Sequence, residues 1–273
     1  MARLQRKLVK NNSVKVLNQS LKKIIVLNKH EGETPLEILE VFRRKHGKYK
    51  DIKMTYAGRL DPMASGLLII LTGEECKKKD EYLKLDKEYE FEVLFGFATD
   101  TYDILGKVIA HACEEHLQAL SVKSLEKDIN KNLKYFKGTF IQKYPIYSSR
   151  TVEGKPLFEY GREGKEVDIP EREVNVKSLK FLKLRKINNK KLLENIEKRV
   201  SKVNGDFRQK EILNIWKKEL KKEETFFVGS FKIKCSSGTY VRGIANSLGE
   251  KMGIPALAFS IKRTKIGKWS KQV

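Results

Sequence analysis

Cysteine, histidine and long apolar runs are scarce in this chain, and each shortage excludes a class of protein. The three cysteines, Cys76, Cys113 and Cys235, form no CxxC pair, and the four histidines form no HExxH pattern. We therefore expect no metal site and a reducing compartment. The apolar run from Leu67 to Leu71 is far too short to span a membrane, and the basic N-terminus lacks the apolar core of a secretory signal.

Nucleotide-binding glycine motifs are also missing. Neither a GxxxxGK[ST] phosphate loop nor a GxGxxG motif occurs, so ATP and NAD chemistry have no support and we expect no cofactor. Positive charge, by contrast, is abundant: the chain has 57 lysines and arginines but only 35 acidic residues, which gives a net charge of +22. This excess favours a polyanionic partner, and nucleic acid comes before a membrane surface.

Hydrophobic periodicity predicts strands and helices that follow one another without regular βαβ repeats. We expect strands near residues 24–27, 89–97 and 227–235, and helices near residues 34–47, 122–135, 156–162 and 239–251. This order indicates an α+β fold, in which helices and loops flank a mixed, mainly antiparallel sheet.

The chain shows no Pro, Gly or Ser-rich linker, so we expect one domain over residues 24–273, preceded by a basic arm at residues 1–23. Residues 186–224 look inserted, because two apolar stripes at helical spacing flank Gly205, with Asp206 capping the second. Their outer face is rich in Lys and Arg. It is either a solvated decoration or an RNA contact, and replacing the segment with a short turn is expected to leave a folded protein.

A single acid, Asp61, lies in a glycine-bounded loop between Gly58 and Gly66, directly before the apolar run. Asp followed by Pro is also a common helix start, in which Asp caps free N–H groups and Pro takes the first helical position. In that interpretation the two glycines serve turns alone. Local sequence leaves both interpretations open.

The loop resembles the catalytic loop of the pseudouridine synthases, and its GxLDPxAxG form is that of the tRNA pseudouridine synthase B family. Other segments match the family in the same order: LNKHEG at 27–32, KEYE at 87–90, TDTYDILG at 99–106, YPIYSS at 144–149, KPLFEYGREG at 155–164, CSSGTYVR at 235–242 and IKRT at 261–264. The resemblance covers residues 24–273 apart from the insertion. It implies the pseudouridine synthase catalytic fold.

The resemblance also implies catalytic roles. Asp61 corresponds to the nucleophile, which splits one difficult step into two easier ones. Arg242 corresponds to the arginine that keeps this carboxylate ionised in a poorly hydrated pocket. Tyr89 corresponds to the tyrosine that stacks on the target base and handles a proton. Without the family pattern, Arg242 reads as a surface or phosphate-binding arginine and Tyr89 as a core tyrosine.

Further positions correspond to the substrate-binding surface. Tyr240 and Ile261 match pocket-lining residues, although the burial preferences of their side chains suit a core position equally well. Lys29 and Arg59 belong to matched segments. Two residues depart from the family pattern: His30 replaces a proline, and Tyr56 replaces the histidine that helps to pry the target base out of its stack. An aromatic ring at Tyr56 still offers a stacking platform for bases.

The sequence thus predicts a tRNA pseudouridine synthase acting on the T-arm uridine at tRNA position 55. The expected reaction is an intramolecular isomerisation without metal or cofactor, performed by a monomer in the cytoplasm on a base flipped out of its stack. We also expect no C-terminal RNA-binding domain after residue 263, with the basic insertion supplying RNA affinity instead. The alternatives are a guide-RNA-dependent synthase and a non-catalytic tRNA-binding or tRNA-folding protein.

Overall fold

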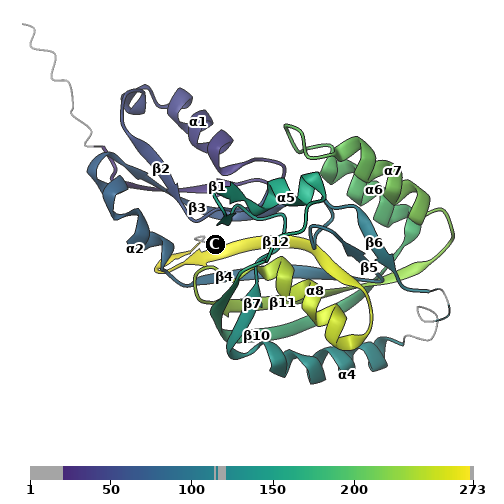
Figure 1. Cartoon of the computed structure of the whole chain (residues 1–273). Helices are drawn as coiled ribbons and strands as arrows, with labels where there is room; N and C mark the ends of the chain where they lie inside the picture. Colours follow the sequence, from purple (N-terminus) through teal and green to yellow (C-terminus); the bar gives the residue numbers. More distant parts are fainter. Residues whose placement is uncertain (1–20, 114, 116–120, 271–273) are drawn as a thin grey trace, which may run out of the picture.

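The computed structural model describes residues 21–113, 115 and 121–270 (Figure 1). The expected basic arm at residues 1–23 therefore lies outside the described residues, apart from its last three positions. The strands of the main sheet are β1 (Ile24–Lys29), β2 (Met54–Ala57), β3 (Ala64–Thr72), β4 (Lys87–Phe95), β7 (Gly138–Lys143), β10 (Glu171–Asn188), β11 (Thr225–Cys235), β12 (Ala256–Ile266) and β13 (Trp269–Ser270).

Within the described residues these strands form one sheet in the order β1-β3-β12-β4-β11-β10-β7, with β2 paired to β3 and β13 paired to β12. All pairs are antiparallel except β3 with β12. Two further sheets have two strands each and are not hydrogen-bonded into the main sheet. One pairs β5 (Phe97–Thr99) with β6 (Val108–His111), and the other pairs β8 (Thr151–Val152) with β9 (Lys155–Pro156). The prediction of an α+β fold with a mainly antiparallel sheet is confirmed.

The predicted helices are present, and their ends follow local capping chemistry. They are α1 (Pro35–Lys45), α4 (Val122–Asn132), α5 (Leu157–Glu163), α6 (Asn189–Val200), α7 (Gln209–Glu219) and α8 (Val241–Met252), and a short helix that was not predicted, α2 (Lys79–Leu83), is also present. Thr34 and Glu37 form a capping box at the start of α1, and left-handed glycines, Gly164 and Gly253, end α5 and α8. The prediction that Asp206 caps α7 is wrong, because Arg208 occupies that position.

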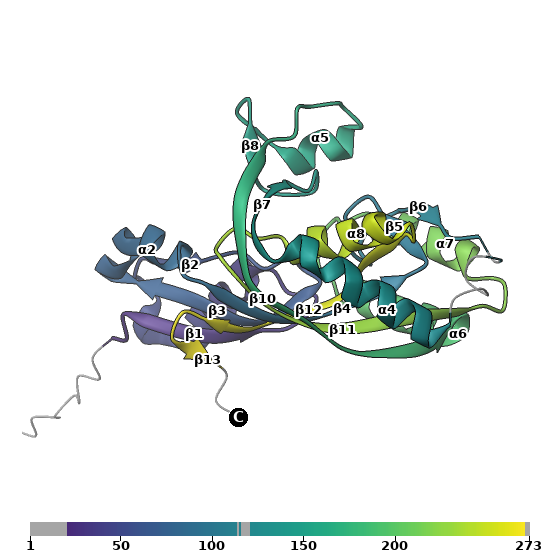
Figure 2. The same cartoon turned by 90° about the horizontal axis from the view of Figure 1, so that it is seen from below.

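The central strands bury both faces. On β4, Phe91, Val93 and Phe95 point into a core that α4 and α8 complete, whereas Leu94 points to the opposite side and into a second core. Figure 2 shows α4 and α8 lying together along one side of the sheet. A separate segment between β7 and β10, residues 144–170, stands out from the sheet on that side and carries β8, β9 and α5 (Figure 2).

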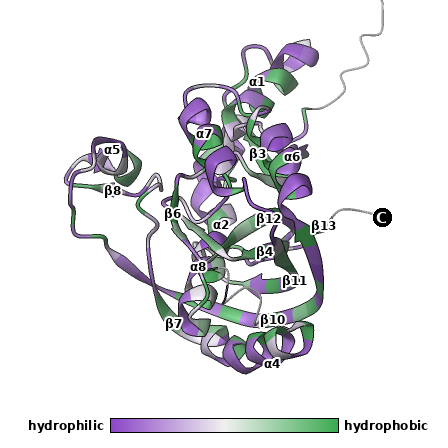
Figure 3. Cartoon of the chain, turned by 90° about the vertical axis from the view of Figure 1, so that its right-hand side faces the viewer, coloured by the Kyte–Doolittle hydropathy of each residue, from purple (hydrophilic) through white to green (hydrophobic). Residues whose placement is uncertain are grey.

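The inserted segment forms the α6–α7 hairpin, and this hairpin contributes one side of the second core. It connects the paired ends of β10 and β11, where Asn188 lies opposite Thr225. Its apolar stripes include Ile196 and Trp216, both fully buried, and they share one cluster with Leu94 and other residues of the sheet. In Figure 3 both helices alternate between hydrophilic and hydrophobic colour, as amphipathic helices do. The hairpin is therefore not a solvated decoration.

Replacing residues 189–224 with a short Gly/Ser turn should prevent folding, contrary to the expectation from sequence. The deletion uncovers Leu94, Phe97, Phe226 and Leu257, each 0% exposed in the intact chain. Exposing one such side chain costs about 1.5–3 kcal/mol, against a total stability of about 5–15 kcal/mol. Circular dichroism, thermal melting and dye binding to exposed apolar surface measure the result. A soluble variant that melts within a few degrees of the parent would contradict it.

No helix among the described residues has the length and apolar character needed to cross a membrane.

Candidate active site

The loop that carries Asp61 joins β2 to β3. The Asp61 carbonyl accepts a hydrogen bond from the Ala64 amide at 2.9 Å, and β3 begins at that residue. Because a strand follows the loop, the interpretation of Asp61 as a helix cap is wrong. Gly66 is required, since its φ is +108° and a Cβ atom there would lie 2.2 Å from the Arg263 carbonyl oxygen on the parallel partner strand β12.

Arg263, on the neighbouring strand β12, anchors the same loop. Its buried guanidinium donates to the carbonyls of Gly58, Arg59 and Leu67, at distances between 2.8 and 3.2 Å. These three bonds fix the backbone on both sides of Asp61. The loop is therefore held by backbone contacts, which do not use the Asp61 carboxylate.

Arg242 lies in the first turn of α8 and makes the ion pair that the sequence predicts. Its Nε donates to Asp61 Oδ2 at 2.8 Å, while its two terminal nitrogens donate to the carbonyls of Thr101 at 2.6 Å and Tyr147 at 2.9 Å. Burial by itself lowers the pKa of Arg242, but the carboxylates of Asp61 and Asp103 reverse this and raise the pKa. The guanidinium is thus a fixed, permanently charged fork.

Water reaches the two partners of this pair unequally. The Arg242 side chain is 3% exposed and the Asp61 side chain 40%. The poorly hydrated pocket expected around the carboxylate is therefore open on one side in the free protein. Only a molecule bound in the cavity could exclude water from this exposed side of Asp61.

Asp103 forms a second, deeper acid beside Arg242. Its carboxylate accepts hydrogen bonds from the Thr101 hydroxyl at 2.8 Å and the Leu105 amide at 2.9 Å. Burial raises the pKa of Asp103 to about 6, against the opposing effect of Arg242. Its bonds close the turn that presents the Thr101 carbonyl to Arg242, so the role of Asp103 is to shape the site.

Tyr89 enters the site from β4 and is 9% exposed. Burial raises the pKa of its hydroxyl, and the positive charge of Arg263 opposes this increase. The hydroxyl therefore keeps its proton at neutral pH, and it accepts a hydrogen bond from Arg263. Tyr89 lines a cavity of about 550 Å³ together with the other residues predicted for the pocket: Arg59, Asp61, Tyr240, Arg242 and Ile261. This volume is typical of a small-ligand site.

Tyr56 and Lys29 lie elsewhere. Tyr56 lines a second cavity of about 330 Å³, which shares Arg59, Asp61 and Arg242 with the first, so the carboxylate faces two adjoining hollows. Lys29 is 0% exposed and reaches neither cavity wall.

The Lys29 ammonium donates to the carbonyls of His30, Glu33 and Pro62, the last at 3.3 Å. Burial lowers its pKa to about 8. Lys29 thus supports the loop beside Asp61, where a phosphate cannot reach it. Its placement does not fit the substrate contact that we expected.

Sequence reasoning missed Arg172, which lies on β10 and lines the larger cavity. A Cβ atom at Gly238 would lie 1.8 Å from its Nη1, so the guanidinium rests directly on the glycine of the CSSGTY loop. Its buried Nε has no hydrogen-bond partner among the described residues. With Lys87 and Arg263 nearby, Arg172 makes this wall strongly cationic. Nothing local in the sequence distinguishes it from the other basic residues of β10.

Among the described residues, no three His, Cys, Asp or Glu side chains gather so that they could hold a metal ion.

The model of the TruB family pseudouridylate synthase N-terminal domain matches residues 44–194. The chain is similar to tRNA pseudouridine synthase B of Lactobacillus acidophilus, with 34% identity over 88% of this chain and 67% of the relative. It is 29% identical to tRNA pseudouridine synthase B of Aquifex aeolicus, over 90% of this chain and 69% of the relative.

Among solved structures, the chain resembles one in a Cbf5-Nop10-Gar1 complex with a TM-score of 0.52 and 17% identity. The match covers 91% of this chain and 50% of the solved chain, so the present chain spans about half of that protein's length. At this identity the likeness shows the fold alone. The family match and the curated relatives go further: the chain belongs to the TruB family of pseudouridylate synthases, and it is therefore an isomerase.

Proposed function

We propose that this isomerase converts the T-arm uridine at tRNA position 55 to pseudouridine, as a cytoplasmic monomer that needs neither guide RNA nor cofactor. The observation that carries the proposal is the Asp61–Arg242 ion pair of 2.8 Å at the wall of a cavity large enough for a nucleotide. The curated relatives are tRNA pseudouridine synthases by name, and the net charge of +22 suits a polyanionic substrate. The free cysteines suit a reducing compartment.

The reaction rearranges bonds within one nucleotide. The bond from N1 of the base to C1′ of the ribose breaks, the base rotates, a bond from C5 to C1′ forms, the proton on C5 leaves, and N1 takes up a proton. Asp61 is the nucleophile, and its attack on either ribose or base yields a covalent intermediate that divides the barrier. Arg242 holds the carboxylate at one angle and keeps it ionised once RNA excludes water.

Binding must first extract the base. Flipping costs a few kcal/mol, which stacking and phosphate contacts offset. Tyr89 offers its ring to the flipped base inside the larger cavity, and Arg172 and Arg59 on the walls offer positive charge to its phosphates. Tyr56 lines the adjoining cavity, and we assign its ring to stacking on a neighbouring base in place of the family histidine.

The two roles of Tyr89, stacking and proton handling, separate in a pair of variants. Tyr89→Phe keeps the ring and loses only the hydroxyl, whereas Tyr89→Ala loses both. We expect Tyr89→Ala to lower the single-turnover rate at least about 100-fold, because one stacking contact of about 1–3 kcal/mol and the pocket wall disappear. If Tyr89→Phe is fully active, Tyr89 acts by stacking alone. If Tyr89→Phe is inactive, its hydroxyl takes part in the reaction. If both variants are fully active, Tyr89 is only a core residue.

A guide-free assay tests the function as a whole. Purified protein is incubated with one unmodified tRNA transcript, and pseudouridine is mapped by position. A matched transcript with cytidine at position 55 is the substrate control. Product at position 55 alone supports the proposal. Product that appears only after guide RNA is added identifies a guide-dependent enzyme, and tight binding without product identifies a tRNA-binding protein.

A further inference from the structure

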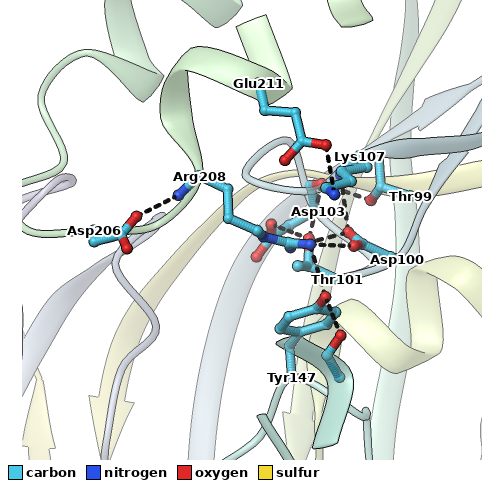
Figure 4. Close-up of polar contacts among 10 residues, drawn as sticks. Thr99, Asp100, Thr101, Asp103, Lys107, Tyr147, Asp206, Arg208 and Glu211 are labelled. Carbon is cyan, nitrogen blue, oxygen red and sulfur yellow. Dashed lines mark hydrogen bonds and ion pairs between the residues drawn. The ribbon is translucent and has the colours of Figure 1, made fainter. Parts of the chain in front are cut away.

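The α6–α7 hairpin reaches the active site through Arg208. This residue precedes α7 with a left-handed φ of +64°, a conformation that non-glycine residues rarely adopt. Its Nη1 donates to Asp100 Oδ2 and to the Tyr147 hydroxyl, both at 2.7 Å, and its guanidinium lies 4.3 Å from the centre of the Tyr147 ring (Figure 4). One hairpin side chain thus joins two segments that are distant in sequence.

Both of these segments hold Arg242. The Thr101 carbonyl, one residue after Asp100, and the Tyr147 carbonyl are the two backbone acceptors of the Arg242 guanidinium. The Tyr147 hydroxyl also donates to the Gly161 carbonyl in α5, which ties the projecting segment to the same point. Glu211 on α7 adds an ion pair of 2.6 Å to Lys107 (Figure 4). Arg208 therefore does not touch Arg242 directly but bonds to the two segments whose carbonyls hold Arg242.

A second hairpin arginine lies behind Asp61. Arg199, on α6, donates to Glu31 at 2.5 Å and to the Phe259 carbonyl at 2.6 Å. Gly32, which follows Glu31 in the chain, donates its amide N–H to the carbonyl of Pro62 at 2.9 Å, and Pro62 is the residue after Asp61. A Cβ atom on Gly32 would lie 2.6 Å from the Lys202 carbonyl oxygen, so the end of the hairpin is packed against this backbone.

We infer that the α6–α7 hairpin is a positioning element of the active site, in which Arg208 fixes the backbone acceptors of Arg242 and Arg199 fixes the backbone beside Asp61. The inference rests on the proposed function, since it concerns the geometry of that catalytic pair. It assigns these hairpin arginines to the chemical step instead of RNA affinity. The side chains of Arg208 and Asp100 are 18% and 19% exposed. Arg208 also lines the second cavity, but its Nη1 is bonded to Asp100 and Tyr147, which suits a brace.

Arg208→Met is the main test, with Lys218→Met as the matched control, because Lys218 is an exposed cation on the same hairpin. We expect Arg208→Met to lower the single-turnover rate at saturating enzyme about 10–100-fold, as small misplacements of catalytic groups do. Its Kd for tRNA should change less than threefold and its salt dependence not at all. Lys218→Met should leave the rate unchanged. Arg208→Lys, which reaches one of the two acceptors, should recover part of the rate.

Coupling gives a further check. Tyr147→Phe removes the hydroxyl that accepts from Arg208, so Arg208→Met should add less to Tyr147→Phe than it does to the parent. A normal rate in Arg208→Met, with a weaker Kd and a salt slope reduced by about one unit, would overturn the inference and make Arg208 a phosphate contact.

Hydrogen exchange separates this inference from the proposed function, because it needs no RNA and no activity. Backbone amides in residues 99–106 and 144–149 should exchange faster in Arg208→Met than in the parent or in Lys218→Met. Unchanged exchange there overturns the brace, whatever the substrate proves to be. A parent enzyme that forms no pseudouridine at position 55, together with faster exchange in Arg208→Met, overturns the proposed function and leaves the brace standing.

Discussion

Asp61→Asn should abolish pseudouridine formation, with a loss on the order of 10³-fold or more, while the Kd for tRNA stays within about tenfold. The amide keeps the size of the side chain, and its oxygen still accepts the hydrogen bond of 2.8 Å from Arg242 Nε. What it loses is the negative charge, and a neutral amide is a poor nucleophile. RNA affinity survives because phosphate contacts supply most of it. Single-turnover assays and binding titrations on one transcript measure both quantities.

Asp80→Asn is the matched control. Asp80 lines the same cavity as Asp61 but is exposed on α2, and it is not paired with Arg242. The same change of charge there should leave the rate within a few-fold of the parent. If Asp61→Asn retains substantial turnover, or if Asp80→Asn loses as much activity, Asp61 is not the nucleophile.

The parts of the site that the sequence predicted are those fixed by short, contiguous segments. Asp61, Tyr89 and Arg242 each lie in a matched motif, and the structure brings the first and last into contact. Their helices and strands were also predictable, since Pro at the start of α1 and alternation along β4 act locally. Lys29 was misjudged for the same reason: the motif names the residue, and only tertiary packing shows that its ammonium points inward.

The longest strand escaped prediction. β10 runs from Glu171 to Asn188, and register shifts near Val176 and Phe181 interrupt its pairing with β11. A β-bulge moves later side chains to the other face, so the alternation that reveals a strand is lost. Arg172 was missed along with it. The contact of Arg208 with Asp100 spans 108 positions, and no local pattern encodes such a contact.

The hairpin shows how charge patterning misleads when it is read alone. Its lysines and arginines are abundant, but its stripes contain fully buried residues such as Trp216 and Ile212. A helix with one apolar face requires a surface to cover, and here that surface is the second face of the sheet. Two of its arginines then turn inward to the site.

Arg242→Ala should lower activity by about 10³-fold or more and also destabilise the protein. The change removes the charge paired with Asp61 and the donors to the Thr101 and Tyr147 carbonyls. Leaving a buried acceptor unpaired costs about 1–3 kcal/mol, so the melting temperature should fall measurably. Arg242→Lys should also be nearly inactive, because one ammonium cannot span three acceptors arranged around a planar fork.

Arg185→Ala is the control for losing an arginine–carboxylate pair, since Arg185 pairs with Glu92 at 3.1 Å and its side chain is 38% exposed. Such a pair contributes at most about 1 kcal/mol, so its rate and melting temperature should stay close to those of the parent. The double variant Arg242→Ala with Asp61→Asn should be no less active than Asp61→Asn alone, because both residues act as one unit. Normal turnover in folded Arg242→Ala at neutral pH would show that the carboxylate works without its arginine, and the ion pair would then be structural.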